Sequence, residues 1–154
     1  MTEPNNFSWQ RLAQQAEGLL SVSTNRISNA ANLSALLYQE LSDVSWAGFY
    51  FLCGETLMVG PFQGKPACVS IEMGKGVCGA AAASRAAMRV DDVEAFDGHI
   101  ACDADARSEL VVPLVKNGEL LGVLDVDSSL KGRFSDEDEA GLTALARVYL
   151  SSIT

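Results

Sequence analysis

Four cysteines are the residues of this chain that most directly suggest chemistry: Cys53, Cys68, Cys78 and Cys102. No two of them form a C-x-x-C pair, so the usual zinc-finger and thioredoxin signatures are missing. Cys53 ends an apolar run and is expected to be a buried structural thiol. The other three lie near predicted turns, a helix start or a long loop, where a cysteine serves as a small core residue, a metal ligand or a redox group.

His99 is the only histidine and precedes Cys102 by three residues. A single histidine excludes mechanisms that need two. A Cys–His protease dyad normally joins distant segments of a chain, so this adjacent pair does not favour a protease. The histidine therefore assigns no reaction by itself.

Two carboxylates, Asp125 and Asp127, end a predicted strand, and the period-two geometry of a strand places both on one face. Such a pair is either a solvated strand end, a divalent-metal site or a pocket for a cationic group such as an ammonium. No further spacing signature selects a metal. A metal-dependent hydrolase or phosphotransferase is therefore a minor alternative, and no metal site is predicted.

Two aromatic residues share one face of another predicted strand, where Trp46 and Tyr50 flank Gly48. Aromatic pairs in strands usually belong to the core. The gap left by a residue without a side chain can also form a small pocket, which would hold a methyl group, a sulfur atom or a cation against the rings.

The segment 74–79 reads Gly-Lys-Gly-Val-Cys-Gly and matches the dinucleotide-binding pattern G-x-G-x-x-G. Asp91 and Asp92 lie near the offset of the ribose-binding acid that accompanies this pattern. A dinucleotide fold needs parallel βαβ units, whereas the strands predicted on both sides of this segment form hairpins. We therefore expect no NAD binding.

Hydrophobic periodicity predicts the helices that help to position these residues. Four are expected, over residues 7–20, 27–41, 77–88 and 136–153. Ser135, followed by three acidic residues, caps the last of them and puts negative charge at its positive end.

Runs of aromatic and branched residues predict six strands, over 46–52, 56–62, 67–73, 88–90, 110–115 and 119–126. Asn117-Gly118 between the last two favours positive φ at both central positions of a type I′ turn. The stretch 91–108 is predicted to be a long acidic loop, which in a compact domain is usually functional or mobile. This order suits an antiparallel sheet carrying helices on one face.

Composition limits the class of protein. With 154 residues, 48% of them hydrophobic, we expect a single domain over residues 1–154. Twenty acidic against eleven basic residues give a net charge of −9, which repels phosphate backbones and anionic membranes. There is no secretory signal pattern and no uncharged stretch of roughly 18 residues. We expect a cytoplasmic protein without nucleic-acid or membrane partners.

Four segments taken together resemble the free methionine-(R)-sulfoxide reductases, a family of stand-alone GAF-domain enzymes. They are Trp-Ala-Gly-Phe-Tyr at 46–50, Gly-Lys-Gly-Val-Cys-Gly at 74–79, Gly-His-Ile-Ala-Cys-Asp at 98–103 and Leu-Asp-Val-Asp-Ser at 124–128. The resemblance spans essentially the whole chain and includes three cysteines spaced by 10 and then 24 residues. It implies an α+β, GAF-like fold. In that fold a central antiparallel sheet of about six strands carries the N-terminal helix pair and the C-terminal helix on one face and a loop-covered pocket on the other.

The resemblance also implies roles for particular residues. Cys102 matches the nucleophile, Cys68 the principal resolving cysteine and Cys78 a second one. The residues that match the substrate pocket are Trp46, Tyr50, Glu109, Asp125 and Asp127. The substrate implied is free methionine-(R)-sulfoxide, the external reductant is thioredoxin, no cofactor is bound, and a homodimer is a family expectation.

The chemistry of a sulfoxide fits these groups, because its sulfur is electrophilic and its oxygen basic. We expect the Cys102 thiolate to attack the sulfur while Glu109, with Asp127, delivers a proton to the oxygen, which leaves a sulfenic acid that Cys68 or Cys78 resolves. Carboxylates that share a site raise the apparent pKa of the group, so Glu109 can be partly protonated. A non-catalytic GAF-type sensor of a small ligand or of oxidation is the alternative.

Overall fold

The computed structural model describes residues 7–100, 102 and 104–154. The helices are α1 (Trp9–Leu20), α2 (Arg26–Glu40), α3 (Gly76–Ser84) and α4 (Asp136–Ser152), with a short 3-10 helix η1 (Val93–Ala95). The strands are β1 (Trp46–Cys53), β2 (Thr56–Gln63), β3 (Ser70–Glu72), β4 (Met88–Val90), β5 (Ser108–Lys116) and β6 (Glu119–Ser128). Within the described ranges, no helix is both long enough and apolar enough to cross a membrane.

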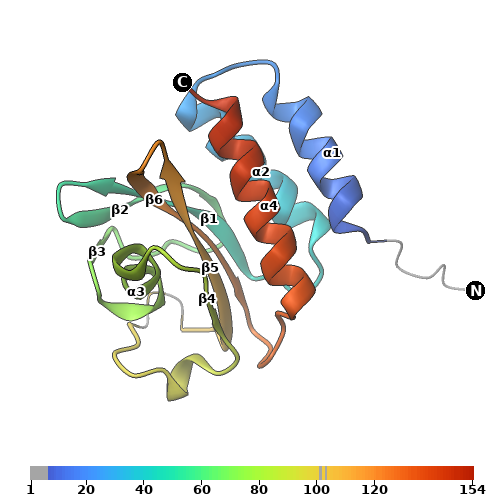
Figure 1. Cartoon of the computed structure of the whole chain (residues 1–154). Coiled ribbons are helices and arrows are strands. Elements are labelled where there is room, and N and C mark those ends of the chain that lie inside the picture. Colours follow the sequence, from blue (N-terminus) through green and yellow to red (C-terminus); the bar gives the residue numbers. More distant parts are fainter. Residues whose placement is uncertain (1–6, 101, 103) are drawn as a thin grey trace, which may run out of the picture.

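The strands form one sheet in the order β3-β2-β1-β6-β5-β4, and every neighbouring pair is antiparallel (Figure 1). The predicted turn joins β5 to β6, with φ of 53° at Asn117 and 79° at Gly118. The described strands contain no parallel βαβ unit, so the structural context that a dinucleotide-binding glycine motif requires is missing.

Helices α1, α2 and α4 form a layer on one face of the sheet, as predicted (Figure 1). Odd-numbered residues of β1, such as Ala47 and Phe49, face this layer, and the Phe49 ring lies 4.8 Å from the Tyr149 ring on α4. Each large apolar side chain buried in this way contributes about 1.5–3 kcal/mol. The layer therefore anchors β1 and β6 at the centre of the sheet.

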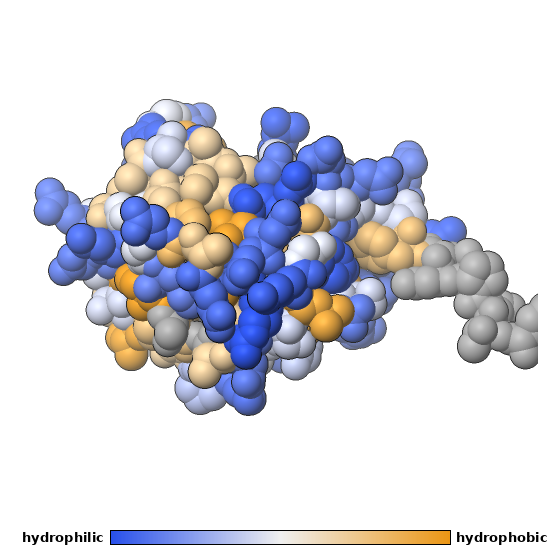
Figure 2. Space-filling view, turned by 90° about the horizontal axis from the view of Figure 1, so that it is seen from below, coloured by the Kyte–Doolittle hydropathy of each residue, from blue (hydrophilic) through white to orange (hydrophobic). Residues whose placement is uncertain are grey.

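The opposite face of the sheet carries α3 and the loop 91–107, of which the structure describes residues 91–100, 102 and 104–107 (Figure 1). Even-numbered residues of β1, including Trp46 and Tyr50, point to this side and pack with Val111, Val123 and Val77. Seen from below, this face combines hydrophilic side chains with a broad apolar area on its left half (Figure 2). The predicted α+β fold, with helices on one face and a covered pocket on the other, is confirmed.

Three local predictions are wrong in detail. Helix α3 ends at Ser84 because Arg85 adopts a left-handed conformation with φ of 54°, so the chain leaves the helix before β4. Strand β3 is limited to the three residues that pair with β2, which leaves Cys68 in the connection before it. Cys53 is exposed, because it is the last residue of β1 and adjoins the tight turn to β2.

Candidate active site

The sheet register brings three acidic side chains together. Glu109 on β5 lies opposite Asp127 on β6, and Asp127 lies opposite Trp46 on β1. One step further along, Asp125 lies between Val111 and Gly48. Directly opposed residues in an antiparallel pair have Cβ atoms about 4.5–5.5 Å apart. Asp125 and Asp127 are only 3% and 7% exposed, which excludes a solvated strand end.

The aromatic pair forms the next wall of the site. The rings of Trp46 and Tyr50 stack with centroids 5.7 Å apart, and the Phe62 ring stacks on Trp46 at 5.1 Å. Trp46 Nε1–H donates a hydrogen bond of 3.1 Å to the Lys65 carbonyl oxygen, which fixes the orientation of the indole. Both rings border the same cavity as the acids, so they serve a pocket as well as the core.

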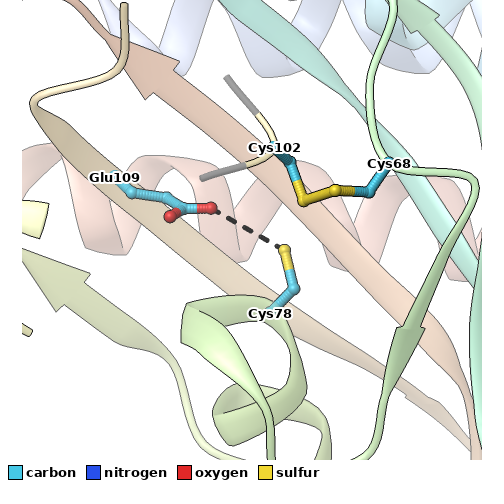
Figure 3. Close-up of a disulfide and its surroundings, with 4 residues drawn as sticks. All are labelled: Cys68, Cys78, Cys102 and Glu109. Atoms are coloured by element: carbon cyan, nitrogen blue, oxygen red, sulfur yellow. Dashed lines mark hydrogen bonds between the residues drawn. A yellow bond between two sulfur atoms is a disulfide. The ribbon is translucent and has the colours of Figure 1, made fainter. Parts of the chain in front are cut away.

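Three of the four cysteines meet at this place. Cys68, in the β2–β3 connection, and Cys102, in the loop 91–107, form a disulfide with Cα atoms 5.1 Å apart. Figure 3 shows the disulfide beside Cys78 of α3, whose Sγ lies 3.7 Å from Glu109 Oε1. Cys53 is not part of this group, and with Cys78 it is a free cysteine of the described chain.

These groups surround a cavity of about 30 Å³. Its lining includes all eight residues predicted for the site except Cys68, which reaches the site through its bond to Cys102. The β2–β3 connection, β3, the start of α3 and the loop contribute further residues that the sequence had not assigned to a pocket: Ala67, Ile71, Lys75, Gly76, Val77, His99, Ile100 and Ala106. For His99, the sequence signal that could have predicted a place in the cavity was its position three residues before Cys102.

Burial and mutual repulsion dominate the electrostatics of the cavity. Burial, and then the charges of Asp127 and Glu109, raises the pKa of Asp125 well above its ordinary value. Burial also raises the pKa of Glu109, so this carboxyl group keeps a proton to higher pH than a solvated glutamate. Burial, followed by Asp125 and Glu109, raises the pKa of the Cys78 thiol. The site therefore holds protons and favours cationic ligands.

A family model for the GAF domain matches residues 15–149, which defines the class of protein to which this fold and pocket belong. The free methionine-R-sulfoxide reductase of Escherichia coli (strain K12) is 53% identical over 134 residues, covering 87% of this chain and 81% of the relative. The structure of free methionine-R-sulfoxide reductase from Neisseria meningitidis with its substrate has a TM-score of 0.93 and 35% identity, covering 99% and 92% of the two chains. A protein from Burkholderia vietnamiensis named as a GAF sensor has a TM-score of 0.92 and 55% identity, covering 94% and 92%.

The chain belongs to the free methionine-R-sulfoxide reductase family of GAF-domain oxidoreductases.

Proposed function

We propose that this protein reduces free methionine-(R)-sulfoxide to methionine by thiol chemistry at the cavity between β1, β6, β5 and α3. The observation that carries the proposal is the Cys68–Cys102 disulfide, which adjoins a pocket of two aromatic rings and three acids. A redox-active cysteine pair supplies the two electrons that the reduction needs, so the reaction requires no bound cofactor.

In the first step, the Cys102 thiolate attacks the sulfoxide sulfur while Glu109 donates a proton to the sulfoxide oxygen. The hydroxyl group then moves from the substrate sulfur to Cys102 Sγ as the bond between the two sulfur atoms breaks, so methionine leaves and Cys102 becomes a sulfenic acid. The raised pKa of Glu109 supports this role, because it keeps the carboxyl group protonated closer to neutral pH. Asp127, opposite Glu109 in the sheet, is the second acid assigned to this step.

In the second step, the Cys68 thiol attacks the sulfenic acid, water leaves and the Cys68–Cys102 disulfide forms. The 5.1 Å between their Cα atoms lies within the range of ordinary disulfides. Cys78, buried on α3, is the second candidate for resolving the sulfenic acid. Thioredoxin then returns two electrons and two protons by thiol–disulfide exchange, a cycle suited to the reducing cytoplasm.

The walls of the pocket account for the specificity that we propose. Trp46 and Tyr50 enclose the S-methyl group, which leaves the R epimer one orientation with its oxygen toward Glu109. Asp125 and Asp127 hold the substrate ammonium, a charge that a peptide-bound methionine sulfoxide does not have. Free amino acid is therefore preferred over peptide.

The test is oxidation of NADPH in the presence of thioredoxin and thioredoxin reductase. Free methionine-R-sulfoxide, free methionine-S-sulfoxide and N-acetylmethionine-R-sulfoxide are supplied in separate reactions. We expect turnover with the free R epimer alone. Equal turnover with the acetylated substrate would contradict recognition of the substrate ammonium by the acidic pocket. No turnover with any of the three substrates would contradict the proposed reductase activity.

Serine variants separate the roles of the cysteines. Cys102→Ser is expected to abolish turnover. Cys68→Ser is expected to abolish the Cys68–Cys102 disulfide, so that any disulfide mapped after one turnover joins Cys102 to Cys78. Cys53→Ser is the matched control, because Cys53 is exposed and does not border the cavity. Unchanged turnover in Cys102→Ser would refute the assignment of the nucleophile.

A GAF-type sensor is the second candidate, and the relative named as a GAF sensor is the observation that favours it. A sensor would be oxidised once per chain and would not consume NADPH in proportion to the sulfoxide supplied. The homodimer that the family resemblance implies is tested separately by sedimentation.

A further inference from the structure

The cavity contains a set of metal-ligand atoms that neither the nucleophile nor the disulfide uses. Cys78 Sγ on α3, a carboxylate oxygen of Glu109 on β5 and one of Asp125 on β6 all lie within 4.8 Å of one another. Three separate elements supply them, so no sequence spacing could have indicated the group. Figure 3 shows the Cys78 thiol directed toward the Glu109 carboxyl group.

A second observation points to a cation at this group. Asp125 is 3% exposed, and its Oδ1 atom has no hydrogen-bond partner among the residues that the structure describes. A buried carboxylate oxygen without a partner is costly, because it has lost its hydration without gaining a replacement. A cation bound to this oxygen would compensate for the lost hydration.

The geometry fits a small tetrahedral cation. Metal–sulfur and metal–oxygen bonds of about 2.3 Å and 2.1 Å imply a sulfur–oxygen edge of about 3.6 Å in a tetrahedral zinc site. The edge between Cys78 Sγ and Glu109 Oε1 is 3.7 Å. The Asp125 oxygen lies at most 4.8 Å from the other two ligand atoms, so it must move closer by up to roughly 1.4 Å to reach the edges of about 3.4–3.6 Å that a tetrahedral site requires.

We propose that Cys78, Glu109 and Asp125 bind a thiophilic divalent cation, of which Zn²⁺ is the physiological representative. The thiol proton, and any proton held by the Glu109 and Asp125 carboxyl groups, leaves to solvent as the metal–ligand bonds form, with no change of oxidation state. A thiolate ligand selects Zn²⁺ or Cd²⁺ over Mg²⁺ and Ca²⁺, which prefer oxygen donors. Three protein ligands leave a fourth position to water.

If the protein has the proposed function, a cation bound at this site also affects catalysis. The cation takes the carboxylates that we assign to the proton transfer and to the substrate ammonium. The sulfoxide and the metal therefore exclude each other, and Zn²⁺ acts as a competitive inhibitor. Binding itself does not depend on that function and is measured without substrate.

The direct test uses protein with the Cys68–Cys102 disulfide closed, because only Cys53 and Cys78 then remain as free cysteines of the described chain. Titration with Cd²⁺ is expected to produce a thiolate-to-metal charge-transfer band in the ultraviolet that saturates at one equivalent and is removed by Zn²⁺ but not by excess Mg²⁺. Absence of the band in this protein would overturn the proposal.

Matched variants identify the ligands. Cys78→Ser is expected to lose the band, whereas Cys53→Ser retains it. Asp125→Asn keeps the shape of the side chain and should weaken binding at least roughly tenfold, since removal of an outer-shell partner alone costs 10–100-fold. Circular dichroism verifies that each variant is folded. A band that survives in folded Cys78→Ser, or disappears in folded Cys53→Ser, would refute this site.

Single-turnover reactions of the reduced protein, without added thiols that sequester metal, test the inhibition. Zn²⁺ is expected to raise the sulfoxide concentration at half-maximal rate and to leave the saturating rate unchanged, and a chelator should reverse the effect. If the metal binds but the active enzyme is not inhibited, the proposed competition with substrate is refuted and the metal site is not. An enzyme without any turnover would contradict the proposed function and leave the binding result standing.

Discussion

Replacing Asp125 by Asn is expected to stabilise the folded protein at neutral pH and to weaken substrate binding. Asp125 is 3% exposed, and its Oδ1 atom has no hydrogen-bond partner in the described part of the chain. Burial, followed by the charges of Asp127 and Glu109, raises the pKa of its carboxyl group well above the ordinary value. Asn has almost the same shape, carries no charge and can donate to the neighbouring carboxylates.

The sign of the pH dependence follows from proton binding. The folded protein keeps the Asp125 proton at pH values where the unfolded chain has lost it. The folded state therefore binds more protons, and the contribution of this group to stability falls as pH rises from about 4. An unsatisfied buried polar group costs about 1–3 kcal/mol, which is the gain expected for Asp125→Asn at pH 8. For a domain of this size that gain raises Tm by roughly 2–12 °C.

Thermal denaturation of the reduced protein at pH 5 and pH 8, followed by circular dichroism, measures the effect. The gain should be larger at pH 8, and calorimetric titration with methionine-R-sulfoxide should show weaker binding by the variant. Asp97→Asn is the matched control, since it removes the same charge from an exposed position. A variant less stable than the parent at pH 8, or a gain equal at both pH values, would refute this reasoning.

Other substitutions test the scaffold of the site. Gly48→Ala is expected to cost at least about 2 kcal/mol, because an added Cβ would lie 2.3 Å from Phe62 Cβ; an unchanged urea midpoint would contradict the close approach of β1 and β2. Ser135→Ala should cost about 1 kcal/mol, since the Ser135 hydroxyl accepts from the Asp138 N–H at the start of α4. Its thermal melt should shift without loss of turnover, and inactivation would show that α4 influences the site.

Period-two alternation was sufficient to predict which side chains share a face. It placed Trp46 with Tyr50 and Asp125 with Asp127, and in the structure each pair borders the same cavity. Alternation within a strand does not say which strands are neighbours. The pairing of β1 with β6, which sets Trp46 opposite Asp127, is a long-range contact that local patterns do not encode.

Sequence-based prediction was weakest for the burial of individual cysteines and for the charged groups around them, because both depend on which distant segments pack on the residue. Cys53 follows an apolar run, as a buried thiol would, yet it is exposed because the strand extends to the turn. Cys78 lies within the glycine-rich segment 74–79, yet its thiol donates to Glu109, 31 residues away. Burial and charge at both positions come from the tertiary arrangement.

The glycine-rich segment 74–79 matches a phosphate-binding pattern, and in this fold its glycines shape a local turn. Gly74 and Gly76 have φ of 81° and 62°, values that let the chain turn from β3 into α3. At Gly76 an added Cβ would already be in contact with Ile100, 3.4 Å away, so any larger side chain would push against the loop. That loop carries Cys102. The glycines that resemble a phosphate-binding turn therefore allow the loop to pack on α3, which brings Cys102 into the cavity that Cys78 also lines.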